Sequence, residues 1–270
     1  MPQCRAYGVE LIVVRASRAQ GKTAELFNRA IAGCTVVVAP GAADLPRLRG
    51  LGLGAATGEW VALTEDHCVP DRAWLQALLT AAAPDVEVLG GSMGNAKRAR
   101  ATDCGAFFSE YGVYGAQQSA TQQDSPPLIT GANVAYHRRI VSDVTDWSMN
   151  GSWENVIHDR LYAAGSRFRL VPEAHVRQNL HYGVREFCRN RYEHGRVYAT
   201  NRVRGQPIWR RVMYAAAVFA LPLLLLMRIA RAADPEERFT FWRAIPATLT
   251  FLAAWSAGEA VGYLLGSVAE

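Results

Sequence analysis

The segment WVALTEDHCVP, residues Trp60–Pro70, places side chains of the metal-ligand type directly after an apolar run. The run Trp60–Leu63 has the character of a buried strand. Three polar side chains follow it closely: Glu65, Asp66 and His67. Oxygen and nitrogen donors of this kind occur both in solvated turns and in metal sites, so the neighbouring elements have to distinguish the two.

Short apolar runs alternate with helical patterns around this segment. Strands are predicted at 9–14, 34–40, 59–64 and 86–91. Helices are predicted at three places: at 15–33, in a segment that ends near Gly58, and in a segment that begins at Asp71. This alternation predicts an α/β fold, a mostly parallel sheet with helices on both faces. Ligands of such sheets bind beyond the carboxyl ends of the strands, which is where the polar side chains lie. The position therefore favours the metal site over the turn.

The size and composition of the chain fit one catalytic domain with an appendage. Its 270 residues are long enough to bury a core, and half of them are apolar, which excludes a disordered chain. The five cysteines form no CxxC pair, which indicates reduced thiols in a domain facing the cytosol. The N-terminal residues lack the basic and apolar regions of a signal peptide.

Positive charge is concentrated between Arg177 and Arg211. This segment holds nine Arg, no Lys and two Glu, whereas the whole chain has a net charge of +5. Apolar side chains recur there on one helical face, with Arg interleaved: Val184, Phe187, Cys188 and Tyr192. The pattern is typical of an amphipathic helix on an anionic membrane surface. Two other interpretations stay open, namely Arg side chains that hold a substrate phosphate and a merely solvated basic helix.

Two apolar stretches follow the basic segment. Val212–Met227 holds 16 residues without a charge, and Ala244–Gly258 is apolar up to Glu259. As a helix the first would be roughly 24 Å long, somewhat short for a membrane span. We expect two hydrophobic membrane helices, as a hairpin or deeply interfacial, with two buried helices of a soluble domain as the alternative. The expected domains are a catalytic domain, a basic interfacial segment and a membrane hairpin, at 1–182, 183–211 and 212–270.

Four segments in order resemble the family 2 glycosyltransferases, which have the GT-A fold. They are LGLGAATGEWVALTEDHCVPDRAWL (51–75), ITGANVAYHRR (129–139), WENVIHDRLYAAGSRFRLVPEAHVRQ (153–178) and FCRNRYEHGRVYA (187–199). Each motif alone is weak, but their succession covers roughly residues 9 to 200. The resemblance implies a GT-A, Rossmann-like sheet and a nucleotide-sugar donor.

The resemblance also implies a divalent metal, Mn²⁺ or Mg²⁺, at the family's Asp-x-Asp position. The aligned residues here are Glu65, Asp66 and His67, with Asp66 the surest expected ligand. A nucleotide-sugar donor leaves as a diphosphate, whose growing negative charge a metal ion neutralises. Because imidazole is a softer ligand than carboxylate, we expect a preference for Mn²⁺.

The same resemblance assigns a catalytic base and binding residues. The family's catalytic carboxylate aligns with Glu154, although the acidic pair usually ends in Asp and here ends in Asn155. Asp159, one helical turn further on, is the alternative base. Donor or acceptor binding is expected from Gly131, Asn133, Arg189, Arg191 and Arg196.

Relative to the family, the chain begins about where the second strand starts, so we expect it to lack the usual first β-α unit. The acid pair that usually ends that second strand is replaced by Arg15-Ala16. We expect a functional enzyme with a shortened N-terminus, and a catalytically impaired homologue is the alternative.

The expected function is inverting transfer of a sugar from a nucleotide-sugar donor to a lipid or cell-envelope glycan acceptor. The expected location is the inner membrane, with the catalytic domain in the cytoplasm. Donor, acceptor and membrane are the expected partners, and nucleic acid is not expected. Two alternatives remain: a membrane-bound binding or scaffold protein without catalysis, and another nucleotide-dependent transferase on the same scaffold.

Overall fold

The computed structural model describes residues 2–16, 34–41, 43–97, 99–116 and 128–265. The helix predicted at 15–33 lies almost entirely outside these residues. The chain forms two compact units. The first unit combines Met1–Ser92 with Ser119–Val176, and the second combines Met93–Gln118 with Arg177–Glu270. Each unit is described by itself below.

The strands form two sheets. A parallel pair joins β1 (Ile12–Ala16) to β2 (Thr35–Ala39), with Ile12 opposite Thr35. The second sheet has five strands in the order β3-β6-β5-β7-β4. Their bounds are Trp60–Thr64 for β3, Cys68–Pro70 for β4, Val88–Asn95 for β5, Asn133–His137 for β6 and Phe168–Gln178 for β7.

The prediction of a mostly parallel sheet is wrong, because the second sheet is mixed. Strand β6 lies between β3 and β5 and is antiparallel to both. It follows that β3 and β5 do run in the same direction, as the alternating pattern predicts, but they are not neighbours. A strand from much later in the chain is inserted between them, and a local pattern carries no information about such an insertion.

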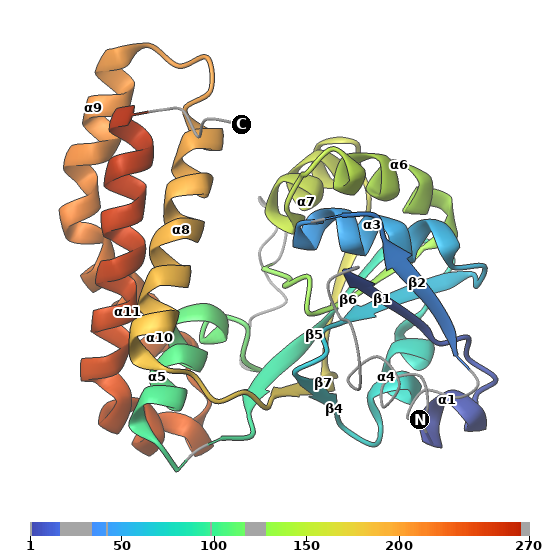
Figure 1. The fold of residues 1–270 in the computed structure, drawn as a ribbon. Helices are drawn as coiled ribbons and strands as arrows, with labels where there is room; N and C mark the ends of the chain where they lie inside the picture. The colour runs from blue at the N-terminus through green and yellow to red at the C-terminus, as the bar shows by residue number, and fades with distance from the viewer. Residues whose placement is uncertain (1, 17–33, 42, 98, 117–127, 266–270) are drawn as a thin grey trace. The chain divides into compact units, whose positions relative to one another are not determined.

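Helices of the first unit lie on both sides of these strands, and those on one side share a core with them. They are α1 (Pro2–Ala6), α3 (Leu45–Ala55), α4 (Trp74–Ala81), α6 (Arg138–Met149) and α7 (Glu154–Ala163). In Figure 1, α3, α6 and α7 gather on one side of the strands and α4 on the other. The core contains Leu53, Val61, Val134, Tyr136 and Ile157, all at most 8% exposed. It fixes the direction in which α3 and α7 present their polar side chains.

Helix α3 begins and packs for identifiable reasons. Asp44 caps its N-terminus, where a side-chain oxygen accepts a hydrogen bond from the Arg47 amide at 3.0 Å. Pro46 occupies the first turn, where its missing N–H costs nothing. Gly50 faces α6, and a Cβ there would lie 2.9 Å from the sulfur of Met149. The glycine therefore permits the close approach of α3 and α6.

The second unit is helical around α11 (Arg238–Leu265). Its other helices are α5 (Ala101–Tyr111), α8 (Val184–Arg202), α9 (Ile208–Ala217), η1 (Val218–Ala220), α10 (Leu221–Ala232) and η2 (Pro235–Glu237). Figure 1 shows α11 between α8 on one side and the continuous stretch α9–η1–α10 on the other.

The prediction of two hydrophobic membrane helices needs correction. Among the described residues one helical stretch, Ile208–Ala232, is long and apolar enough to cross a membrane by length and composition. Helix α11 is 28 residues long but does not qualify. It contains many small and polar residues and buries a large part of its surface against α8 and α5, as expected of a helix inside a protein.

Candidate functional site

Glu154 is the first residue of α7, and its carboxylate is bound by an arginine from another helix. The Oε2 atom of Glu154 lies 2.7 Å from Nη1 of Arg49, and 21% of the glutamate side chain is exposed. Arg49 lies on α3, which packs closely against α6. The expected base is therefore neither a free surface carboxylate nor only a helix N-terminal charge.

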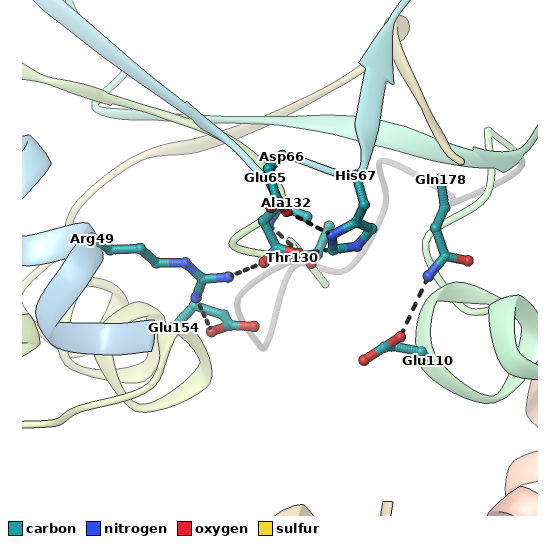
Figure 2. Close-up of polar contacts among 9 residues, drawn as sticks. All are labelled: Arg49, Glu65, Asp66, His67, Glu110, Thr130, Ala132, Glu154 and Gln178. Atoms are coloured by element: carbon teal, nitrogen blue, oxygen red, sulfur yellow. Dashed lines mark hydrogen bonds and ion pairs between the residues drawn. The ribbon is translucent and has the colours of Figure 1, made fainter. Parts of the chain in front are cut away.

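Arg49 also binds the acid that follows β3. Its Nη2 atom lies 2.6 Å from Oε1 of Glu65, and 12% of the Arg49 side chain and 14% of the Glu65 side chain are exposed. We call the chain Glu154–Arg49–Glu65 the Arg49 bridge; Figure 2 shows it. A Cβ at Gly131 would collide with the guanidinium of Arg49, so the glycine makes room for it. The bridge thus joins the expected base to the expected metal site.

The charges of the bridge support one another. Burial would raise the pKa of Glu154, but the charge of Arg49 and its hydrogen bond outweigh burial and hold the pKa below its usual range. Burial would lower the pKa of Arg49, yet the two carboxylates raise it. At neutral pH the carboxylate of Glu154 is therefore ionised and able to accept a proton.

A neutral pair lies beneath the bridge. The Nε2 atom of His158, one turn along α7 from Glu154, is 2.8 Å from the hydroxyl of Tyr136. Burial lowers the pKa of His158 to about 4, with Glu154 opposing this shift, and burial raises the pKa of Tyr136. At neutral pH this pair carries no charge, so the charges nearest to it are those of the bridge.

The residues after β3 form a compact donor cluster. One donor atom from each of Glu65, His67 and Cys68 lies within 4.8 Å of the others. The Oε2 atom of Glu65 is 3.3 Å from Nε2 of His67. Two atoms that bind one ion at about 2.1 Å lie roughly 3 Å apart, so this pair fits a metal ion as it stands. Carboxylate and imidazole suit Mn²⁺, whereas the thiol of Cys68 would favour a softer ion such as Zn²⁺.

Asp66, the surest ligand expected from the sequence, points elsewhere. Its side chain is 98% exposed, and its Oδ1 atom lies 3.3 Å from Nδ1 of His67. This hydrogen bond is the main reason that the pKa of Asp66 is lowered. In the structure Asp66 therefore orients the imidazole, which is how carboxylates support metal-binding histidines. Metal binding by Asp66 itself stays a prediction.

Asn133 is engaged inside the fold. Its amide nitrogen donates to the carbonyl oxygens of Ser92 at 2.9 Å and Ala174 at 2.8 Å. Its amide oxygen accepts from the indole of Trp74 at 2.9 Å. Both amide hydrogens are used, and the residue is fully buried. Its observed role is to tie β6 to its neighbours, and substrate binding by Asn133 stays a prediction.

The three arginines expected to bind substrate lie on α8 of the second unit. Arg191 is buried, where its Nη2 donates to the Ser109 carbonyl at 3.2 Å and its guanidinium covers the Trp255 ring at 4.3 Å. Arg196 binds Glu193 at 3.0 Å, and Arg189 is exposed. Asp159, the alternative base, is exposed on α7. Their roles in substrate binding or catalysis stay predictions.

The sequence motifs do not identify two residues of the site, Arg49 and Cys68. Arg49 stands in an apolar, glycine-rich helix segment, LPRLRGLGLGA, and a charge on the buried side of such a helix is a sign of a partner. Cys68 directly follows the predicted ligands and is 7% exposed. A small pocket beside the bridge is lined by apolar side chains and by Arg49, Ser148, Ser152 and Glu154. The expected base therefore faces the pocket.

Comparison with known proteins identifies a solved structure of similar fold. No protein-family model and no curated protein sequence matches the chain. Among solved structures, the mannosyltransferase PcManGT from Pyrobaculum calidifontis, in complex with GDP-Man and Mn²⁺, is similar with a TM-score of 0.50 and 15% identity. The similarity covers 93% of this chain and 77% of that chain. The chain therefore shares the fold of a glycosyltransferase, while membership of family 2 with the GT-A fold stays a prediction.

Proposed function

We propose that this protein is a metal-dependent glycosyltransferase that moves a sugar from a nucleotide-sugar donor to a lipid or cell-envelope glycan at a membrane. One observation carries the proposal. A partly buried, ionised carboxylate, Glu154, is linked through one guanidinium to Glu65, the acid that begins the donor cluster after β3. The shared fold with a mannosyltransferase supports the same conclusion.

The chemistry follows from these groups. The oxygen of the acceptor hydroxyl forms a bond to the anomeric carbon of the donor sugar, and Glu154 accepts the proton that this hydroxyl loses. The bond from that carbon to the diphosphate breaks on the opposite side, which inverts the configuration. A divalent ion held by Glu65 and His67 would supply positive charge for the departing diphosphate. Arg49 keeps Glu154 ionised and holds its carboxylate in one orientation.

The test uses the purified full chain and a panel of nucleotide-sugar donors. Release of nucleoside diphosphate is measured with a polyprenyl phosphate or glycan acceptor, in Mn²⁺, in Mg²⁺ and after chelation. We expect release with at least one donor, dependent on metal and faster with Mn²⁺ than with Mg²⁺. Equal rates in the two metals would contradict the proposed imidazole ligand, and full activity after chelation would contradict metal dependence.

A second candidate is a homologue that binds a donor without turning it over. Two observations favour it: Asn155 replaces the second acid of the family's pair, and Oε1 of Glu65 is already bound by Arg49. Donor binding measured by calorimetry, together with no product from any donor in the panel, would support this candidate over the enzyme.

A further inference from the structure

The second unit exposes an unusually apolar face. On α9–η1–α10 the side chain of Phe219 is 89% exposed, Leu223 60% and Met213 57%. Between Val212 and Met227 there is no charged residue. Soluble proteins rarely expose contiguous apolar surface of this kind without a partner. We call the exposed side of α9–η1–α10 the apolar face.

Helix α8 has the opposite character. Its exposed side chains are charged along the length of the helix, as at Arg185, Arg189, Glu193 and Arg202. Its apolar side is used inside the protein, because Phe187 is 2% exposed and its ring lies 4.7 Å from that of Phe251 on α11. The sequence pattern predicts that this apolar side lies on a membrane. The structure instead buries Phe187 and partly buries Cys188 and Tyr192, and Val184 at the start of the helix is 44% exposed, so most of the exposed surface of α8 is polar or charged.

The backbones of α8 and α11 are in close contact, so the two helices would have to lie at a similar depth in any membrane. A Cβ at Gly195 would collide with the carbonyl oxygen of Trp255. A Cβ at Gly258 or Gly262 would collide with the carbonyl oxygens of Tyr192 and Arg196. These contacts repeat over two turns of both helices, which therefore run side by side.

The stretch α9–η1–α10 is fastened to the same α11. The guanidinium of Arg211 donates to the carbonyl oxygens of Tyr263 and Leu264, each at 2.9 Å, near the C-terminal end of α11. The rings of Tyr214 and Tyr263 lie 5.4 Å apart. Three helical stretches therefore form one body, with α11 in the middle.

This body cannot cross a bilayer as it stands. Helix α8 has 19 residues and is about 28 Å long, nearly the thickness of the hydrocarbon core. If the bundle stood upright, the charged side of α8 would enter lipid, where each charge at the centre of the bilayer is strongly unfavourable. Lying flat, the same bundle places its apolar face in lipid and α8 in water.

We propose that the second unit lies in the plane of an anionic membrane surface, with α9–η1–α10 in the lipid interface and none of its helices spanning. The charges and rings at the ends of the apolar face fit this partner. Arg210 and Arg228 are exposed at either end of it, and Trp209 is 57% exposed beside Arg210. Basic residues and Trp are favoured at the lipid headgroups. The inference rests on the membrane location in the proposed function but not on sugar transfer.

The first experiment determines on which side of the membrane the two turns lie. Arg204, between α8 and α9, and Glu236, between α10 and α11, are both exposed. The variants Arg204→Cys and Glu236→Cys are labelled with a membrane-impermeant maleimide in inverted vesicles and in spheroplasts, with the unsubstituted chain as the baseline. We expect both to react from the same face only. Labelling from opposite faces would show that Ile208–Ala232 spans, and would overturn the proposal.

The second experiment measures binding to vesicles of anionic or neutral lipid by flotation. Phe219→Asp should weaken binding to anionic vesicles by at least about tenfold, because it removes a large apolar group and adds a charge that lipid disfavours. Leu79→Asp, at a 48% exposed leucine of the first unit, is the matched control and should bind as the unsubstituted chain does. Unchanged binding of Phe219→Asp, or no flotation of the unsubstituted chain, would overturn the proposal.

A further measurement separates this inference from the enzymatic proposal. Donor turnover in detergent with a soluble acceptor should be the same for Phe219→Asp as for the unsubstituted chain. An active enzyme that does not bind vesicles would refute only the membrane surface, whereas vesicle binding without turnover would refute only the sugar transfer.

Discussion

Two glutamates, one in each unit, have pKa values shifted in opposite directions. Glu154 is bound by a guanidinium, and its pKa is lowered. Glu259 on α11 is 5% exposed and accepts hydrogen bonds from the indole of Trp255 and from the hydroxyl of Tyr263, the latter at 2.9 Å. Burial raises its pKa, and these two donors together with the charges of Arg202 and Arg191 offset burial only in part.

The comparison shows what makes a buried carboxylate suitable as a base. Both glutamate side chains have hydrogen-bond partners, so hydrogen bonding alone does not explain why their pKa values shift in opposite directions. The direct ion pair does, because the guanidinium bound to Glu154 outweighs burial there, whereas the charges of Arg202 and Arg191 do not outweigh burial at Glu259. Glu154 therefore has a charge state suited to chemistry, and Glu259 one suited to joining two turns of a helix.

The largest expected effect comes from removing the charge at Glu154. Glu154→Gln should lower kcat by about a thousandfold, the range for loss of a general base, without changing donor affinity. Glu259→Gln is the matched control and should keep kcat within about twofold. Steady-state kinetics and donor calorimetry measure both. If the two variants had equal activity, the distinction drawn between the glutamates would be wrong.

The second effect comes from removing the cation between two acids. Arg49→Met should lower the free energy of unfolding by about 3–5 kcal/mol, since it removes the cation that pairs with two partly buried carboxylates. Arg47→Met is the control, because its ion pair with Asp44 is 3.8 Å long and about half exposed. Urea denaturation measures both.

The same variant makes a prediction about pH. Without Arg49, burial is left to raise the pKa of Glu154, so the base becomes protonated at a higher pH. The acidic limb of the profile of kcat/KM against pH should therefore move to higher pH in Arg49→Met. A limb that stays in place would mean that another group limits the rate.

The third effect concerns stability below neutral pH. The folded pKa of His158 is about 4, below the ordinary 6.5, so the unfolded chain binds more protons between these values. Stability should fall as pH drops from 6.5 to 4, by roughly 3 kcal/mol from this residue. His158→Gln keeps a hydrogen-bonding group for Tyr136 but does not titrate. The pH dependence of the free energy of unfolding should be shallower in the variant than in the parent chain, and parallel curves would count against the assignment.

The smallest effect tests the space beside Arg49. Gly131→Ala introduces a methyl group that collides with the guanidinium and should cost about 1–3 kcal/mol in stability and roughly tenfold in kcat. Gly54→Ala is the control on the same helix as Arg49, since its methyl group would meet Thr145 at an ordinary 3.6 Å. Equal behaviour of the two variants would show that the position of Arg49 does not matter.

Local patterns predicted the parts of the site but not its assembly. The strand before Glu65 follows from hydrophobic periodicity, which acts over a few residues. The Arg49 bridge joins residues 16 and 105 positions apart, and no local pattern relates them. The insertion of β6 between β3 and β5 is a long-range pairing of the same kind. The outward direction of Asp66 depends on the geometry of one turn, which sequence spacing does not specify.

The first unit is built from two separate lengths of chain, Met1–Ser92 and Ser119–Val176. During synthesis, Arg49 and Glu65 leave the ribosome long before Glu154 exists. Closing so large a loop is slow because chain entropy must be lost before any contact compensates for it. Until the second length has been made, Arg49 in the nascent chain can pair with Glu65 but not with Glu154. The site therefore cannot form before the second length has been made, and a ribosome-bound chain that ends before residue 154 should lack it.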